Sequence, residues 1–100
     1  MAPIVWLVTG TTSGLGAALV EHIVSRGDKV IASGRKVEQR LGQLKAKFGP
    51  ENFALLELDI TAGPTVIAAK IKEAWEIFGH IDVLMNNAGM SAMRSAEEAE

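Results

Sequence analysis

Four short runs of apolar residues recur along the chain, and each has the pattern of a buried β-strand. The runs are rich in aliphatic and β-branched side chains and show no alternation of polar and apolar positions, which is typical of a parallel strand covered on both faces. They span residues 4–8, 29–33, 53–58 and 81–85. The pattern therefore predicts four strands of one parallel sheet.

Between these runs, apolar residues recur at the three- and four-residue spacing of amphipathic helices. The periodic segments end at Arg26, Phe48 and Phe78, each directly before a glycine that can stop a helix. We expect residues 37–48 to form one of these helices without a break. Strands that alternate with helices of about 10–15 residues predict βαβ units with right-handed crossovers. The expected fold is α/β, with the first four strands of a doubly wound parallel sheet.

The handedness of the crossovers also predicts how the sheet is covered. The first two helices should lie on one face and the third alone on the other, which leaves that face incompletely covered and the fourth strand at an edge. Helical spacing places His22 on the core-facing side of its helix, and we expect His22 and His80 to be structural or solvated. Trp75 is expected to be buried. Asp82 is expected to brace the turn before the fourth strand. His22 and His80 have no carboxylate at a ligand-like spacing, so we assign neither a metal site nor a catalytic histidine.

Composition narrows the class of protein. With 48% hydrophobic and 22% charged residues, the chain resembles an ordinary globular domain. A net charge of −2 provides no broad basic surface, so we expect no nucleic-acid partner. The absence of cysteine fits a reducing compartment, and we expect the cytoplasm. The first apolar run is far shorter than a membrane span, so no membrane association is expected.

A glycine-rich turn, residues 9–16, joins the first strand to the first helix. Gly10 permits a tight turn, while Gly14 and Gly16 remove side chains where a ligand and the facing strand come close. The unpaired N–H groups of a helix N-terminus can hold a pyrophosphate there, although a ligand-free loop explains three glycines equally well. A P-loop would need a Lys-Ser/Thr pair after the last glycine, and a nucleophile elbow a glycine two positions before its serine; the turn has neither.

Three motifs, in this order, resemble the short-chain dehydrogenase/reductase family. They are Thr-Gly-x3-Gly-x-Gly from Thr9, Asp59 at the end of the third strand, and Asn-Asn-Ala-Gly from Asn86 after the fourth. Together they cover nearly the whole chain and are far more specific than glycine spacing alone. The resemblance implies a Rossmann-like fold and a nicotinamide coenzyme. It also implies an oxidoreductase that acts on carbonyl or hydroxyl groups by hydride transfer.

The resemblance further implies which residues contact the coenzyme at its pyrophosphate, its adenine amino group and its ribose. These sets are Gly10, Thr12, Ser13, Gly14, Leu15 and Gly16 for the pyrophosphate, Asp59 and Ile60 for the adenine, and Asn87, Ala88 and Gly89 for the ribose. Asn86 would instead bond backbone groups of neighbouring strands. For Asp59, a structural role in the turn before Thr61 is the alternative.

The end of the second strand indicates which coenzyme is preferred. An NAD site keeps an acid there for the ribose 2′-OH, whereas an NADP site needs a cation for the 2′-phosphate. The residues at this point are Gly34 and Arg35, and no acid follows until Glu38. We therefore predict that Arg35 binds the 2′-phosphate and that the coenzyme is NADP; a solvated Arg-Lys pair is the alternative. A methyltransferase is disfavoured because its cofactor's ribose diol needs an acid at this position.

The residues of the family's chemistry have no counterpart here. The family uses a tyrosine as general acid/base, a lysine one helical turn later and a serine that orients the substrate carbonyl, and this sequence contains no tyrosine. We assign no catalytic residue and expect residues 1–100 to be a partial NADP-binding domain, inactive alone because the catalytic half is absent. The whole protein is expected to be a homo-oligomer acting on a small carbonyl or alcohol substrate, which the sequence does not identify. Alternatives are a non-catalytic NADP(H)-binding or sensing protein, or an inactive truncated fragment; a Tyr-x3-Lys pattern after Glu100 would favour the enzyme.

Overall fold

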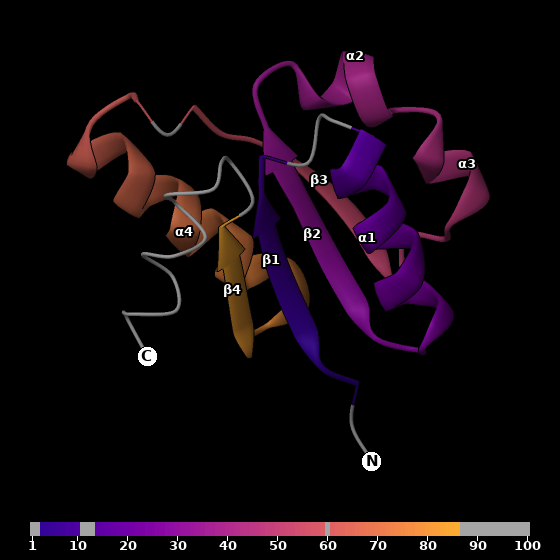
Figure 1. The fold of residues 1–100 in the computed structure, drawn as a ribbon. Coiled ribbons are helices and arrows are strands. Elements are labelled where there is room, and N and C mark those ends of the chain that lie inside the picture. Colours follow the sequence, from indigo (N-terminus) through magenta and orange to yellow (C-terminus); the bar gives the residue numbers. More distant parts are fainter. Residues whose placement is uncertain (1–2, 11–13, 60, 87–100) are drawn as a thin grey trace.

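The computed structural model describes residues 3–10, 14–59 and 61–86, which form an α/β unit on one parallel sheet (Figure 1). Its strands are β1 (Val5–Thr9), β2 (Lys29–Gly34), β3 (Phe53–Glu57) and β4 (Val83–Asn86). All paired strands run parallel, in the order β3-β2-β1-β4. The chain therefore moves from β1 to one edge and then crosses to the other side of β1. This is the predicted doubly wound, Rossmann-like arrangement.

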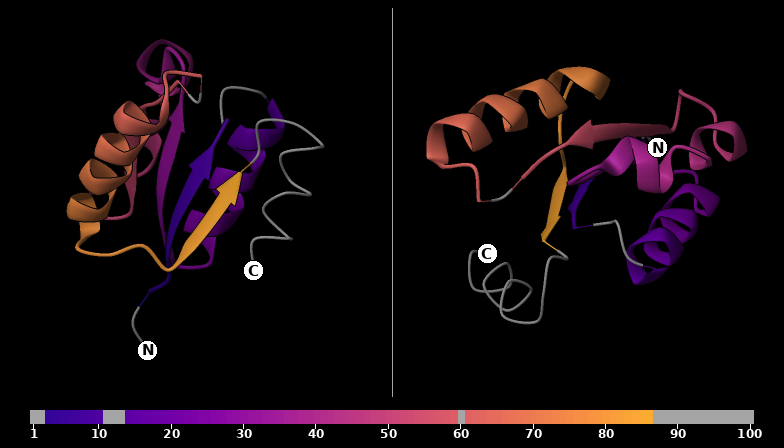
Figure 2. Two further views of the ribbon diagram at one scale, coloured as in Figure 1. Left: turned by 90° about the vertical axis from the view of Figure 1, so that its left-hand side faces the viewer. Right: turned by 90° about the horizontal axis from the view of Figure 1, so that it is seen from above.

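The helices lie on the two faces that the handedness rule predicts. They are α1 (Gly14–Ser25), α2 (Val37–Leu41), α3 (Leu44–Lys47) and α4 (Pro64–Phe78). Figure 2 shows α4 on one face and the other helices on the opposite face. The connections from β1 to β3 move in one direction across the sheet and that from β3 to β4 in the other, so right-handed crossovers require this division. In the described part of the chain, no helix is long and apolar enough to cross a membrane.

The helix predicted over residues 37–48 is interrupted, because α2 and α3 are separate at Gly42 and Gln43. The N–H of Gly42 donates to the carbonyl of Glu38 at 3.0 Å, and a Cβ on Gly42 would lie 2.4 Å from that same oxygen. A side chain at position 42 would therefore collide with this oxygen unless the backbone shifted. Leu41 and Leu44 still pack on the same apolar cluster, so the periodicity continues through a break that it does not reveal.

Each face of the sheet has its own apolar cluster. Val8 belongs to the cluster under α1–α3, whereas its neighbour Leu7 belongs to the cluster under α4. Successive strand residues point to opposite faces, so burial on both sides requires the continuous apolar runs seen in the sequence. The buried members under α1–α3 are Val8, Val20, Ile23, Val30, Ala32, Val37, Leu41 and Phe53, and those under α4 are Val5, Leu7, Ile31, Leu56 and Ala74.

Two helical residues with core-facing spacing, Trp75 and His22, lie at the surface. Trp75 was expected in the core but is 49% exposed, because it faces a part of the sheet beside β4 that nothing in the described chain covers, whereas Ala74 is the buried residue of α4. His22 is exposed as well, since the buried face of α1 runs through Val20 and Ile23. The prediction for Trp75 was therefore wrong, and His22 takes the solvated one of its two expected states.

Two aspartates hold the amino end of β1. Asp28 accepts the N–H of Ile4 at 3.2 Å and the indole N–H of Trp6 at 3.3 Å. From the β4 side, Asp82 accepts the N–H of Val5 at 2.8 Å. This confirms that Asp82 braces the start of β4. The Asp82 carboxylate also lies 3.0 Å from Nε2 of His80, a pair that the sequence pattern did not indicate.

Candidate functional site

The carboxyl ends of β1, β2 and β3 meet at one edge of the sheet, near the top of Figure 1, where the chain leaves β2 for α2. Ligands of open parallel α/β sheets bind outside this edge, at the point where the strand order reverses. Here the reversal falls between β1 and β4, because β1 connects to β2 on one side while β4 lies on the other. The segments after β1 and β4 flank this point, and those after β2 and β3 lie beside β1 at the same end of the sheet; together they are the candidate site.

The glycine turn after β1 has the predicted strand-turn-helix geometry. β1 ends at the buried Thr9, Gly10 follows with φ 67°, and α1 begins at Gly14. An L-residue rarely adopts this positive φ, which explains the glycine at position 10. Leu15 and Gly16 lie in the first turn of α1, whose N–H groups have no partners within the helix. Thr12 and Ser13 lie outside the described residues, so their contact with a pyrophosphate stays a prediction.

The end of β2 presents a cation. Ser33 is fully buried and its hydroxyl donates to the carbonyl of Val8 at 3.1 Å, which ties β2 to β1 at this edge. Gly34 ends the strand and is buried, and Arg35 follows it directly as an exposed residue. No acidic side chain occupies the strand end itself. Arg35 is therefore exposed at the strand end, and its contact with a 2′-phosphate stays a prediction.

Glu57, which the sequence analysis did not select, shapes the segment around Arg35. It is the last residue of β3 and pairs in register with Gly34. Its two carboxylate oxygens accept the backbone N–H groups of Lys36, at 2.8 Å, and Val37, at 3.1 Å. Lys36 is the non-glycine residue with positive φ in the described chain, at 55°. No sequence motif marks Glu57, because its partners are 20 and 21 residues away along the chain.

Asp59 has the structural role in the turn before Thr61 that was the alternative to a contact with adenine. Its Oδ1 accepts the N–H of Thr61 at 2.9 Å and the hydroxyl of Thr61 at 2.6 Å. These two bonds hold the pKa of Asp59 below its ordinary value, the positive charge of Arg35 lowers it further, and desolvation opposes the shift. Arg35 and Asp59 follow the carboxyl ends of the neighbouring strands β2 and β3, so both belong to the same end of the sheet. The contact of Asp59 with an adenine amino group remains a prediction.

The remaining predicted contacts are at the adenine and the ribose. Ile60, Asn87, Ala88 and Gly89 lie outside the described residues. β4 ends at Asn86, which pairs in register with Thr9, so the chain leaves β4 beside the glycine turn. The predicted ribose segment therefore starts at the same edge as the rest of the site.

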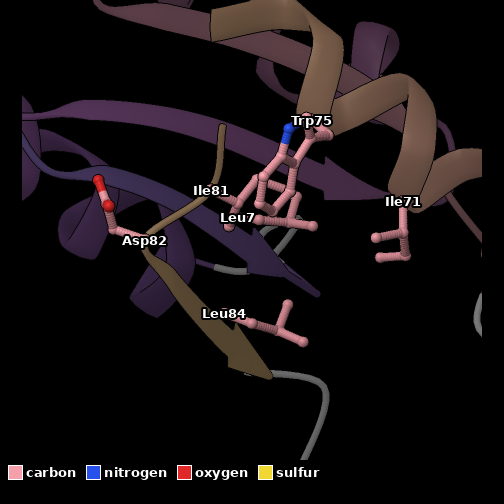
Figure 3. A pocket seen from close by; sticks show the side chains of 6 residues that line it. All are labelled: Leu7, Ile71, Trp75, Ile81, Asp82 and Leu84. Carbon is pink, nitrogen blue, oxygen red and sulfur yellow. The ribbon is translucent and has the colours of Figure 1, made fainter. Parts of the chain in front are cut away.

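A separate apolar hollow of about 250 Å³ opens on the α4 face of the sheet (Figure 3). Its lining residues are Leu7, Ile71, Trp75, Ile81, Asp82 and Leu84. The carboxylate of Asp82, the charged group among them, is bonded to the backbone of Val5 near the amino end of β1. The hollow thus lies away from Arg35, and it marks the incompletely covered face that the topology predicted, where Leu84 is 56% exposed. We do not assign it a coenzyme.

The family model of short chain dehydrogenases matches residues 4–100. The chain belongs to this family. It is 42% identical over 96 residues to Oxidoreductase BOA17 of Botryotinia fuckeliana, an alignment that covers 96% of this chain and 34% of the relative. It is 35% identical over 96 residues to the NADP-dependent 3-hydroxy acid dehydrogenase YdfG of Escherichia coli K12, covering 93% of this chain and 37% of the relative.

Solved structures of the family have the same fold as this short-chain dehydrogenase chain. A short-chain dehydrogenase from Streptomyces avermitilis superimposes with a TM-score of 0.77 at 39% identity, covering 88% of this chain and 31% of that one. Serine dehydrogenase from Escherichia coli gives a TM-score of 0.68 at 35% identity, covering 87% and 38%. The chain spans about a third of the length of the curated relatives it matches.

Proposed function

We propose that this chain is the NADP(H)-binding portion of an oxidoreductase that acts on carbonyl or hydroxyl groups of a small molecule. The observation that carries the proposal is the exposed Arg35 directly after Gly34, at the carboxyl end of β2. An NAD-selective site would keep an acid at this strand end. The name of the Escherichia coli relative YdfG, an NADP-dependent enzyme, supports the same preference.

The two carboxylates beside Arg35 are compatible with a bound phosphate. Both oxygens of Glu57 accept backbone N–H groups, and Oδ1 of Asp59 accepts two bonds from Thr61. These bonds direct both carboxylates toward the loops that they hold. A 2′-phosphate carries between about 1.5 and 2 negative charges near neutral pH, and a guanidinium can meet two of its oxygens at once.

The bound coenzyme would supply the hydride to a carbonyl or accept it from an alcohol, and the residues of this chain would bind and orient the coenzyme. In this proposal the first turn of α1 holds the pyrophosphate, Arg35 holds the 2′-phosphate, and Asp59 accepts a hydrogen bond from the adenine amino group. The sequence contains no tyrosine, and we assign no proton-transfer group among residues 1–100. We accordingly expect no turnover from residues 1–100 alone; reproducible coenzyme-dependent turnover by that chain would contradict this. A cytoplasmic, homo-oligomeric state of the whole protein remains a prediction.

The proposal is tested by titrating NADPH and NADH into the full-length protein and its Arg35→Ala variant. Charge-assisted hydrogen bonds contribute about 1.5–3 kcal/mol, so the variant should bind NADPH about ten- to a hundredfold more weakly and NADH nearly unchanged. Gly34→Asp combined with Arg35→Ala should turn the preference toward NADH. Arg40→Ala, which removes an equal charge from the exposed side of α2, is the matched control and should leave both affinities unchanged. Equal losses for both coenzymes in Arg35→Ala would contradict the proposal.

A further inference from the structure

Glu57 lies on β3, the strand next to β2, and from there it holds the segment that carries Arg35. The last residue of β3 lies beside Gly34 in the sheet, and the N–H of Leu58 donates to the carbonyl of Gly34 at 3.0 Å. This backbone pairing fixes the base of the Glu57 side chain against the end of β2. From there its carboxylate accepts the N–H groups of Lys36 and Val37 at 2.8 and 3.1 Å. Both peptide groups that follow Arg35 are therefore tied to β3.

The conformation of Lys36 is a second, independent sign that this segment is held. Its φ of 55° and ψ of 37° are left-handed, and no other non-glycine residue in the described chain has a positive φ. This conformation is unfavourable for a side chain with a Cβ and persists only where surrounding contacts determine it. The Lys36 N–H has Glu57 as its acceptor, so the same carboxylate that caps α2 also stabilises the left-handed turn. That turn sets the direction in which the chain leaves Arg35.

We propose that Glu57 is a positioning residue for coenzyme selectivity: it holds residues 34–37 so that Arg35 meets the 2′-phosphate of NADP(H). The inference rests on the proposed function, because it concerns the same phosphate. Glu57 itself contacts backbone N–H groups and does not contact the coenzyme. Its effect on binding is therefore transmitted through Arg35.

Charge repulsion alone would have the opposite effect on NADPH binding. A carboxylate near a phosphate repels it, so removal of Glu57 would strengthen NADPH binding if charge alone mattered. At an exposed edge this repulsion is screened by solvent and salt, and we expect it to change the affinity by no more than about twofold. Loss of both bonds, in contrast, frees a left-handed residue next to Arg35 and removes the preorganisation of the guanidinium. We expect the second effect to dominate.

The test compares NADPH and NADH binding by the full-length protein and its Glu57→Ala variant. NADPH should bind about three- to tenfold more weakly, while NADH should change by less than about twofold, because NADH has no group for Arg35. Glu57→Gln keeps one acceptor oxygen and should lose less. Glu38→Ala removes an exposed carboxylate from the same region without touching the loop amides, and it controls for charge. If Glu57→Ala does not fold, the NADPH and NADH affinities of Glu57→Gln are compared with those of the wild-type protein instead.

A double-mutant cycle with Arg35→Ala separates positioning from a general structural role. In the Arg35→Ala background, Glu57→Ala should cause no further loss of NADPH affinity. Equal losses for both coenzymes, an undiminished loss in that background, or tighter NADPH binding would each overturn the inference. If Arg35→Ala weakens NADPH but Glu57→Ala does not, the inference fails and the proposed function stands. If Arg35→Ala has no effect on NADPH, the proposed function itself fails.

Discussion

At both ends of the parallel sheet, carboxylates accept hydrogen bonds from backbone N–H groups, but the cations beside them differ. At the amino end, Asp28 and Asp82 hold the start of β1. Lys29 lies at this end, where its Nζ donates to the carbonyl of Glu51 and lies 5.1 Å from the centre of the Phe78 ring. The polar groups of the amino end are therefore engaged with the protein's own backbone and side chains.

The carboxyl end has the same kind of carboxylate contact in Glu57, but its cation is placed differently. Arg35 is exposed, and within the described residues it forms no salt bridge; its charge acts on Asp59. A carboxylate bonded to the backbone therefore does not by itself distinguish a structural end of the sheet from the proposed binding end. The two ends differ in their cations: Lys29 is engaged with the protein, whereas Arg35 remains available to an anion from outside it. The following predictions test whether the two ends can be perturbed separately.

The largest effect on stability is expected at the amino end. Asp28→Ala leaves the Ile4 N–H and the Trp6 indole N–H without their acceptor, and Asp28 is nearly buried. We expect a loss of about 2–3 kcal/mol in the free energy of unfolding, measured by denaturant titration of the full-length protein. Asp28→Asn, which keeps one acceptor oxygen, should lose less. A changed ratio of NADPH to NADH affinity in either folded variant would contradict the separation of the two ends.

A smaller effect is expected from acid, again at the amino end. The hydrogen bond from the Val5 N–H holds the pKa of Asp82 below its ordinary value of 3.8, and His80 adds to the shift while desolvation opposes it. Because the folded pKa is the lower one, ionised Asp82 stabilises the fold above pH 3.8, and this contribution is lost as the pH falls through the folded pKa. Asp82→Asn should therefore flatten the decline of stability below about pH 4. The pKa of Asp59 is lowered too, so Asp59→Asn measures the separate contribution of that carboxylate to the decline. An unchanged decline in Asp82→Asn would contradict the assignment.

The smallest effect is expected at the carboxyl end, from Lys36→Gly. A residue with a Cβ in the left-handed conformation costs about 1–2 kcal/mol, and replacement by glycine removes this cost. The extra freedom of glycine in the unfolded chain offsets about 0.5–1 kcal/mol of the gain. The free energy of unfolding should therefore rise by about 0.5 kcal/mol. Lys45→Gly, at a helical position in α3, should instead lower it by about 0.5–1 kcal/mol. A loss of stability in Lys36→Gly would show that the side chain, and not the backbone conformation, matters at this position.

Much of the fold follows from the sequence because burial on both faces demands continuous apolar strands. The division of helices between the faces follows from crossover handedness alone. The break at Gly42 was not predictable, since Leu41 and Leu44 keep the periodicity on both sides of it. The burial of Trp75 was predicted wrongly because hydrophobicity does not show which side of α4 lacks a covering element.

The candidate site was predictable to the extent that its groups are adjacent in sequence. Arg35 follows the end of β2 directly, so local pattern placed it at the correct edge. Glu57 was missed because its role depends on the register that sets it beside Gly34, which no local pattern encodes. The turn formed by Asp59 with Thr61 spans only two residues and was accordingly among the alternatives considered.

The central claim is that the carboxyl end of β2 recognises a 2′-phosphate through Arg35. It is tested most directly by the dissociation constants of NADPH and NADH for the full-length protein, measured at one ionic strength. We predict that NADPH binds about ten- to a hundredfold more tightly than NADH, as one or more charge-assisted hydrogen bonds require. Equal affinities, or tighter binding of NADH, would contradict the account.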